Sequence, residues 1–422
     1  MTGVDNGEDV GAKGNALRVL HTADWHIGQT LNGWSRHEEH RIWFERLGDV
    51  IEQQAVDVLI VAGDIYDGIN PSGESQKLLY SALRSFKDRR PELCTVITSG
   101  NHDPTVRLEA PGPILASLDV HVIATMRHIA DAIDYAQHMI PLCDASGTVR
   151  AWVCAIPFLR AADLPGLSFA ADEKRGSPIV EAARRFHADM AEAALAHAGG
   201  LPILAMGHLH CHGATESEGA ERRILIGGEH ALSEDVFPEA FDYVALGHLH
   251  RPQNLDGGRI RYSGSCFPLS AAEISYDHGV TLIDIDAEGL RKHHLSIERP
   301  VEMIRLPAQG AMTFEAFEVA LEQIALQEDL PKSLRPFVYV NLQATGPASV
   351  LLADVEKLLA KYPLRTAGVR VQRLTEQSEQ TAPISLAETT PEELFRKAFE
   401  SVNATTPDEQ HISAFRDAAT GA

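Results

Sequence analysis

The amino-acid sequence predicts an α/β protein of two to three domains. Its 422 residues exceed the usual size of one domain, and its 44% hydrophobic and 23% charged residues are typical of a globular chain. Short β-branched runs alternate with stretches of helical periodicity, as they do in βαβ units. No apolar run reaches the length of a membrane span, so we exclude a transmembrane protein.

The composition restricts the compartment and the partners. The first residues are polar and glycine-rich without an apolar signal-peptide core, so we expect residues 1–16 to form a disordered leader. Five scattered cysteines without a C-x-x-C pair indicate reduced thiols in the cytoplasm. A formal net charge of −22 argues against nonspecific nucleic-acid binding through a broad basic surface. Nucleic-acid binding would therefore need metal ions, a local basic path or a partner.

A large α/β region is expected over residues 17–300. Its predicted strands are Arg18–His21, Val56–Ala62, Cys94–Thr98, Val120–Ile123, Arg150–Ala155, Ile203–Met206, Tyr243–Leu246, Arg259–Tyr262 and Val280–Ile285. Helical periodicity covers Glu38–Gln53 and Glu74–Phe86. His37 and His40 accompany the first of these helices, where we expect them to be solvated or to cap the helix, with contact to a DNA backbone as the alternative.

A smaller α/β unit is expected over residues 301–374, and a tail follows it. The unit reads strand, helix, strand, helix, strand, at Val301–Leu306, a helix capped by Thr313, Phe337–Leu342, Ala348–Lys361 and Val369–Leu374. Residues 375–389 are polar and predict a linker. Residues 390–422 predict two short capped helices with Phe395, Phe399 and Phe415 on their apolar stripes. We expect this tail to bind a partner, and folding back onto the main region is the alternative.

Residues that bind metals or transfer protons follow five predicted strands. They are Asp24 and His26, Asp64 and Asp67, Asn101 and His102, His208, and His248 and His250. Each motif alone is more often a turn, but five in succession favour one site, because sites in open α/β sheets form at the carboxyl ends of strands. Carboxylate, amide and imidazole ligands without thiolate suit two divalent ions of the Mn, Fe or Zn kind. A shared carboxylate could bridge such ions at ~3.5–4 Å, as in two-metal phosphoester chemistry.

The order of these motifs resembles the calcineurin-like metallophosphoesterase superfamily. The motifs are D-x-H, G-D-x-x-D, G-N-H-D, G-H and G-H-x-H, within HTADWHIGQ (21–29), VAGDIYD (61–67), GNHDPTVRL (100–108) and YVALGHLHRPQ (243–253). SRHEEH (35–40) and YSGSCFPLS (262–270) narrow the resemblance to bacterial nuclease subunits that work with an SbcC-like coiled-coil ATPase. The resemblance implies a four-layer α/β/β/α sandwich, a small α/β cap domain over 301–374 and a helical partner-binding tail.

The resemblance also implies a role for each residue. One metal ion would be held by Asp24, His26, Asp64 and His250, and the other by Asp64, Asn101, His208 and His248, with Asp64 bridging. His102 would protonate the leaving group or steady the phosphate, and Asp67 would orient it. The ions would be two divalent ions, typically Mn²⁺. G-H-L-H occurs twice, so His210 or His212 could take the place of His208.

The function that the resemblance implies is exonucleolytic and endonucleolytic hydrolysis of DNA phosphodiester bonds, at ends and hairpins, in DNA repair, recombination and replication. A homodimer within a heterotetramer with the ATPase is the implied assembly. One alternative is a stand-alone hydrolase of a small phosphodiester, which would need neither cap nor tail. Another is an inactive DNA-docking adaptor, which would not need the complete ligand set. Trp25 is expected to pack in the core, with a position over the substrate path as the alternative. Arg107 is expected to contact the DNA backbone or support the site.

Overall fold

The computed structural model describes residues 16–130, 132–165, 177–217, 221, 231–344, 347–373, 395–396, 399 and 406–420. They belong to two compact units, Met1–Gln372 and Arg373–Ala422. The expected leader, except Ala16, and the expected linker lie outside the described residues. Within the described ranges, no helix combines the length and the apolar character needed to cross a membrane.

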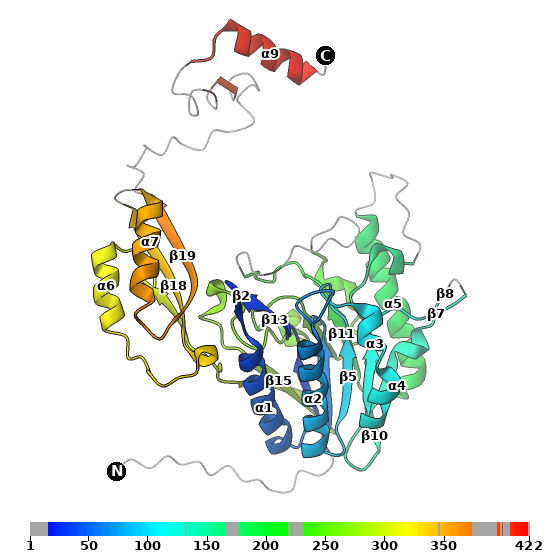
Figure 1. Ribbon diagram of the computed structural model, residues 1–422. Helices are drawn as coiled ribbons and strands as arrows, with labels where there is room; N and C mark the ends of the chain where they lie inside the picture. The colour runs from blue at the N-terminus through cyan, green and yellow to red at the C-terminus, as the bar shows by residue number, and fades with distance from the viewer. Residues whose placement is uncertain are drawn as a thin grey trace. The chain divides into compact units, whose positions relative to one another are not determined.

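One six-stranded sheet carries the N-terminal motifs (Figure 1). In order across the sheet, its strands are β16 (Gly289–Ser296), β15 (Gly279–Asp286), β1 (Leu17–Thr22), β4 (Val58–Ala62), β5 (Cys94–Thr98) and β6 (Val120–Ile123). The last four run parallel, with Val19 opposite Val58, Val58 opposite Cys94 and Thr95 opposite Val120. Their carboxyl ends therefore meet at one edge of the sheet.

A second six-stranded sheet carries the later histidine motifs. Its strands in order are β13 (Gln253–Leu255), β14 (Ile260–Tyr262), β12 (Tyr243–Gly247), β11 (Ile203–His208), β10 (Val149–Cys154) and β9 (Met139–Cys143). β14, β12, β11 and β10 are parallel neighbours, so this sheet too gathers carboxyl ends at one edge.

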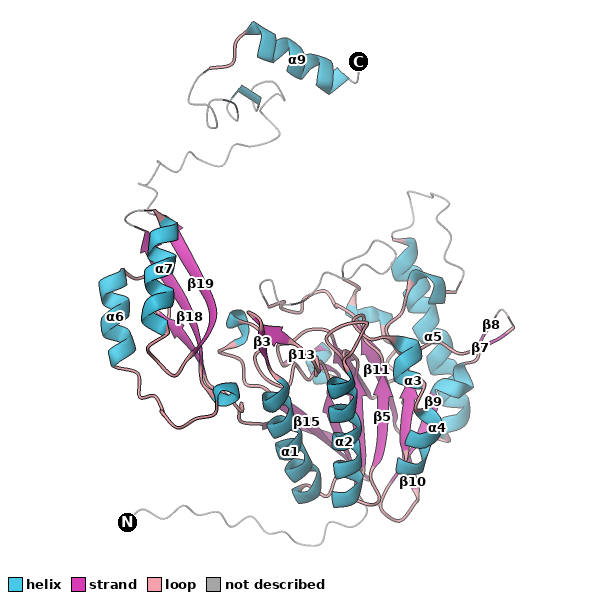
Figure 2. Cartoon of the chain, in the orientation of Figure 1, coloured by secondary structure: helices cyan, strands magenta, loops and turns pink. Residues whose placement is uncertain are grey.

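The two sheets pack face to face and helices cover their outer faces (Figure 2). The buried layer between the sheets includes Val19, Ile60 and Val96 from the first sheet and Leu204 and Ala245 from the second. Helices α1 (His37–Gln53) and α2 (Gly73–Arg89) cover the first sheet, and α5 (Pro178–Ala198) covers the second. The predicted four-layer α/β/β/α fold is confirmed.

Short elements complete this region. They are β2 (Thr30–Leu31), β3 (Trp34–Ser35), α3 (Thr105–Glu109), α4 (Gly112–Leu115), β7 (His128–Ile129) and β8 (Ala132–Ile133). The β2–β3 hairpin starts only four residues after His26, so it is close in sequence to the predicted site.

The small α/β unit has a sheet and a core of its own. The sheet has the order β17 (Met303–Leu306), β18 (Phe337–Ala344) and β19 (Arg365–Arg373), with helices α6 (Phe314–Glu322) and α7 (Ala348–Leu359) packed on it. The Thr313 hydroxyl accepts a hydrogen bond from Ala316 N and caps α6 as expected. Phe317, Val340 and Val355 are buried in the core between sheet and helices.

The tail contains α9 (Glu409–Thr420) and helical residues at 395, 396 and 399. The rings of Phe395 and Phe415 stack with centroids 4.6 Å apart, and the ring of Phe399 lies 4.6 Å from that of His411. The aromatic side chains of the two helical segments therefore contact each other within this unit.

Candidate metal centre

The predicted ligands meet where the carboxyl ends of the two sheets adjoin. Three groups of buried metal-ligating side chains lie at this edge, and within each group the ligand atoms are within 4.8 Å of one another. The groups are Asp24–His26–His250, His26–Asp64–His102 and Asp24–Asp64–His208. They share members, so they form one centre rather than three separate sites.

Asp64 lies at the middle of this centre. Its Oδ2 atom is 3.5 Å from His26 Nε2 and 3.4 Å from His208 Nε2. Its Oδ1 atom accepts a hydrogen bond of 2.9 Å from the backbone N–H of His102. Burial opposes its ionisation, but His208 above all holds the pKa of Asp64 well below its usual range. Asp64 is therefore an ionised carboxylate among imidazoles from both sheets.

His208 has a fixed orientation and tautomer. Its Nδ1 lies 3.0 Å from the Ala62 carbonyl oxygen, which can only accept, so Nδ1 carries a proton. Its Nε2 lies 3.0 Å from Asn101 Oδ1 and faces Asp64. Burial disfavours the imidazolium, yet the Asp64 and Asp24 carboxylates outweigh burial and raise the pKa of His208 to about 9. Nε2 is thus placed to hold either a proton or a metal ion.

His250 is oriented by a residue that the sequence analysis missed. Its Nδ1 lies 3.1 Å from Oε1 of Glu273, a fully buried carboxylate. Burial disfavours the charged ring, but Glu273 raises the pKa of His250 to about 9. A carboxylate behind a metal-ligating histidine fixes the ring and raises its basicity. Glu273 therefore orients the predicted ligand His250.

Asp24 and His248 are joined through the backbone. The N–H of His248 donates to both carboxylate oxygens of Asp24, at 2.9 and 3.1 Å. Because Asp24 follows β1 and His248 follows β12, this contact connects the two sheets directly at the site. Burial and the positive charge of His208 hold the pKa of His248 well below its usual range, so its ring is neutral and able to bind a metal.

Four of the predicted ligands have left-handed backbone conformations. The φ angles are 51° at Asp24, 46° at His26, 49° at Asp64 and 96° at His248. Each such conformation costs ~1–3 kcal/mol and persists only where surrounding contacts determine it. Concentration of this strain on the predicted ligands supports a functional role for the edge.

Gly100 and Gly247 each precede a predicted ligand, and each lets its loop approach another part of the site closely. A Cβ at Gly100 would lie 2.0 Å from Asp64 Oδ1, and a Cβ at Gly247 would lie 2.0 Å from the Ala62 carbonyl oxygen. These distances are too short for any side chain. The G-N-H and G-H motifs therefore contain glycine because another part of the site occupies the space of a Cβ.

Asp103 connects the loops that follow β4 and β5. Its carboxylate accepts hydrogen bonds from the backbone N–H groups of Ile65 at 3.1 Å, Tyr66 at 2.9 Å and Gly100 at 2.8 Å. Burial and the charge of Asp64 raise the pKa of Asp103 to about 6. The last residue of G-N-H-D thus holds the loops that carry Asp64 and Asn101.

His102 and Asp67 lie beside the centre. His102 Nδ1 is 2.8 Å from the main-chain carbonyl oxygen of Asp67, and the Asp67 carboxylate is 3.3 Å from His26 Nδ1. The main chain of Asp67 therefore orients His102. The rings of His102 and His26 meet edge to face, with centroids 4.9 Å apart.

The donor set fits divalent metal ions. Among the described residues, the buried His26 ring makes no hydrogen bond at either nitrogen, and Nε2 and Nδ1 have only ion-pair contacts, 3.5 Å to Asp64 and 3.3 Å to Asp67. A buried polar atom without a hydrogen bond costs free energy. Oxygen and imidazole ligands without thiolate match Mn, Fe or Zn. Metal coordination would satisfy His26 and neutralise the Asp24 and Asp64 carboxylates.

The other histidines that the sequence singled out lie apart from these groups. His210 Nδ1 is 3.0 Å from Glu216 Oε1, and His212 is exposed. His37 is exposed, but the expectation of a solvated or capping His40 is wrong, because His40 is fully buried and its Nε2 lies 2.7 Å from the Trp25 carbonyl oxygen.

Trp25 and Arg107 contact protein groups in this structure. Trp25 packs edge to face on Phe44 in the core, as expected. The Arg107 guanidinium donates a hydrogen bond to Asn70 Oδ1.

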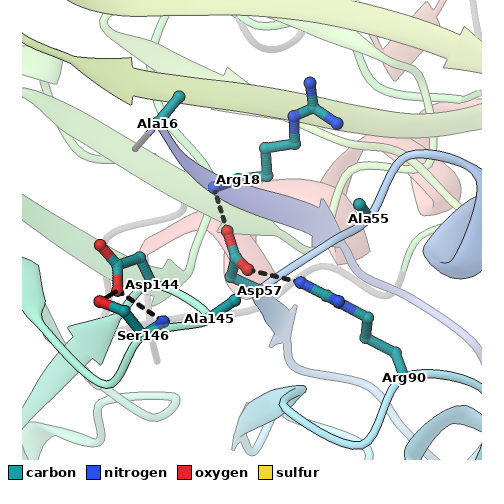
Figure 3. Close-up of a pocket in the computed structure, with 8 residues that line it drawn as sticks. All are labelled: Ala16, Arg18, Ala55, Asp57, Arg90, Asp144, Ala145 and Ser146. Carbon is teal, nitrogen blue, oxygen red and sulfur yellow. Dashed lines mark hydrogen bonds and ion pairs between the residues drawn. The ribbon is translucent and has the colours of Figure 1, made fainter. Parts of the chain in front are cut away.

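A separate cavity of about 490 Å³ lies at the amino ends of β1 and β4 (Figure 3). Asp57 lines this cavity and accepts hydrogen bonds from the backbone N–H of Arg18 at 3.0 Å and from the Arg90 guanidinium at 2.9 Å. This cavity is at the opposite end of the strands from the predicted ligands, so its residues are suited to control variants.

Comparisons with known proteins agree with this geometry. A family model described as calcineurin-like phosphoesterase matches residues 17–252, and one described as the Type 5 capsule protein repressor C-terminal domain matches residues 299–403. The chain is 52% identical over 384 residues to the SbcD subunit of the SbcCD nuclease of Rhodobacter capsulatus, covering 91% of this chain and 94% of that one. It is 30% identical over 395 residues to the corresponding SbcCD nuclease subunit of Escherichia coli, covering 90% and 92%.

We predict that Glu273→Gln weakens metal binding. A neutral amide cannot raise the basicity of His250 as the carboxylate does, so Mn²⁺ affinity should fall ~10–100-fold. Isothermal titration of the metal-depleted protein measures this affinity. Asp57→Asn is the control, because it removes a buried carboxylate at the far end of the strands. Unchanged Mn²⁺ affinity in a folded Glu273→Gln protein would contradict the role of Glu273.

Proposed function

Because the chain belongs to the calcineurin-like phosphoesterases, and within them to the SbcD family of SbcCD nuclease subunits, we propose that it is a Mn²⁺-dependent DNA exonuclease and endonuclease acting at DNA ends and hairpins. Its class is that of a metal-dependent phosphodiesterase. The observation that carries the proposal is the environment of Asp64. Its carboxylate is buried and ionised, and its Oδ2 atom lies 3.5 Å from His26 Nε2 and 3.4 Å from His208 Nε2.

Asp64 belongs to both of the proposed ligand sets. Asp24, His26, Asp64 and His250 would hold one ion, and Asp64, Asn101, His208 and His248 the other. Two bound divalent ions would activate a water molecule and neutralise the charge that develops on the phosphate. The hydrogen bonds from His208 to Ala62 and from His250 to Glu273 direct the Nε2 atom of each ring into the centre. This orientation supports His208, rather than His210 or His212, as the ligand.

His102 is proposed to act as a proton donor near the leaving oxygen. Since the Asp67 carbonyl accepts from Nδ1, the neutral ring has no proton on Nε2 and can donate from that atom only as imidazolium. An approaching phosphate anion favours the imidazolium form. Because the main-chain carbonyl of Asp67 makes this contact, Asp67→Asn would leave it in place.

A nuclease assay tests the proposal, using linear duplex DNA, hairpin DNA and a small chromogenic phosphodiester with and without Mn²⁺ and the ATPase partner. We expect Mn²⁺-dependent cleavage of all three substrates. His102→Ala should lower the rate ~10²–10⁴-fold while metal content stays at the wild-type level. His37→Ala, which removes an exposed histidine, is the control. Hydrolysis of the small diester alone would support a stand-alone hydrolase, and no hydrolysis with Mn²⁺ bound would support an adaptor.

We propose a coiled-coil ATPase of the SbcC kind as the partner, in a heterotetramer with two copies of this cytoplasmic chain. The relatives are named as SbcD subunits of SbcCD nucleases, which supports this assembly. A net charge of −22 is also easier to reconcile with DNA binding if a partner supplies part of the DNA path. The α/β cap is proposed to present duplex DNA to the metal centre.

The tail is proposed to bind the ATPase. Phe395 and Phe415 stack on each other, so the two helical segments can dock as one preformed pair. Deletion of residues 385–422 should abolish co-purification with the ATPase, because the docking helices are removed. Mn²⁺-dependent hydrolysis of a small phosphodiester by the isolated chain is the control and should be unchanged. Binding of the truncated chain to the ATPase with wild-type affinity would contradict this role.

A further inference from the structure

Three charged side chains are buried together where the cap meets the large α/β region. Arg36 precedes α1, Glu39 lies in the first turn of α1, and Arg365 begins β19 of the cap. Each is 1% exposed. Arg36 Nη2 is 2.6 Å from Glu39 Oε2, and Arg365 Nη2 is 3.3 Å from Glu39 Oε1. The two oxygens of one carboxylate therefore hold two arginines, one on each side of the boundary.

On the cap side of Glu39, Arg365 is fixed by contacts with other residues of the cap. Arg365 Nε donates to the Arg335 carbonyl oxygen at 2.8 Å, and its guanidinium lies 3.7 Å from the centre of the Phe337 ring. Beside it, the side chains of Asn32 and Trp34 donate to the Thr366 carbonyl oxygen at 3.0 and 3.1 Å. The cap is thus attached to the hairpin that directly follows the predicted ligand His26.

An apolar cluster surrounds these polar contacts. Its buried members are Leu31, Val301, Met303, Phe337 and Ala367. This cluster alone would bury apolar surface and hold the cap in contact. The buried charges are therefore not the sole contact between the cap and the large region, and burying them is expensive unless their geometry is specific.

The Arg36 side of the network reaches the metal centre. Arg36 Nη1 donates to the Pro268 carbonyl oxygen at 2.6 Å and to Gln29 Oε1 at 3.2 Å. Gln29 Nε2 in turn donates to the Leu269 carbonyl oxygen at 3.0 Å. Arg36 and Gln29 therefore hold successive carbonyl groups of one loop.

That loop positions Glu273. The backbone N–H of Leu269 donates to Glu273 Oε2 at 2.9 Å, and Glu273 Oε1 is 3.1 Å from His250 Nδ1. A continuous set of short contacts thus runs from the cap through Arg365, Glu39 and Arg36 to the loop, and from the loop to His250.

We propose that Glu39 is a positioning residue that anchors both the cap and the Glu273 loop, so that DNA on the cap and the His250 ring are each held in place by one carboxylate. One carboxylate oxygen holds the cap through Arg365, and the other holds the Glu273 loop through Arg36. This inference rests on the proposed nuclease function, in which duplex DNA engages the cap. Cleavage of duplex DNA therefore depends on the whole network, whereas hydrolysis of a small diester depends only on the Arg36 side.

Two substitutions separate the two sides. Arg365→Met and Arg36→Met each remove one arginine, preserve an apolar stem and leave Glu39 paired with the other arginine. Glu39→Gln weakens both contacts. Each variant is measured for Mn²⁺ affinity by titration of metal-depleted protein, for kcat and KM on a small phosphodiester, for duplex DNA cleavage and for thermal unfolding. Arg150→Met, which removes an ion pair with Asp144, is the control.

We expect Arg365→Met to reduce duplex cleavage ~10²-fold through misplacement of the substrate, with Mn²⁺ affinity and small-diester kcat unchanged. Arg36→Met should lower Mn²⁺ affinity about tenfold, and Glu39→Gln should show both effects. If Glu39→Gln does not fold, Glu39→Asp tests the same point by shortening the carboxylate stem.

Two results would overturn this role of Glu39. The first is equal loss of duplex and small-diester activity in Arg365→Met. The second is a folded Glu39→Gln protein that unfolds at a lower temperature but keeps wild-type Mn²⁺ affinity and the wild-type ratio of the two activities. The Mn²⁺ titrations of Arg36→Met need no substrate, so they test the Arg36 side even if the wild-type chain cleaves no DNA.

Discussion

The Asp64 carboxylate is held between groups from both sheets, and this requirement constrains how the sheets pack. Asp64 follows β4 of the first sheet, but one of its imidazole neighbours, His208, ends β11 of the second. The two sheets must therefore pack with their carboxyl edges in register before the centre can form. The contact between the His208 ring and the Ala62 carbonyl, and the one between His248 N–H and Asp24, fix that register through groups that belong to the site itself. Fold and site are consequently stabilised by the same contacts.

This arrangement has an energetic cost that nearby backbone contacts offset. Left-handed conformations at Asp24, His26 and Asp64 bring side chains from short loops into one small volume. The Asp103 carboxylate holds three backbone N–H groups of the loops around Asp64, and the N–H of His102 binds Asp64 itself. Repulsion between the buried Asp24 and Asp64 carboxylates remains, and bound cations would relieve it. Metal binding is thus expected to stabilise the fold as well as to supply the chemistry.

The parts of the site that the sequence predicts are those that adjoin a recognisable strand. Asp24, Asp64 and His208 each stand within two residues of a strand end, so local pattern and sheet topology suffice to bring them together. Glu273 lies 23 residues from His250, and Arg365 lies 326 residues from Glu39, in segments without a pattern that marks them as partners.

Helix α5 was missed because its buried face is mostly alanine, which gives little contrast with the exposed face. His40 was misjudged because polar residues on helices are usually solvated, whereas tertiary packing buries this ring against the Trp25 carbonyl.

We propose that Asp64 joins two metal ions in one centre, and electron paramagnetic resonance of the Mn²⁺-loaded protein tests this role. Two Mn²⁺ ions that share a carboxylate at ~3.5–4 Å are magnetically coupled, so the spectrum should be that of an interacting pair. Asp64→Asn should replace that spectrum with the signal of isolated Mn²⁺ or abolish binding, while circular dichroism shows a retained fold. A wild-type spectrum of isolated ions at saturating Mn²⁺, or a coupled pair that survives in Asp64→Asn, would contradict a metal pair joined by Asp64.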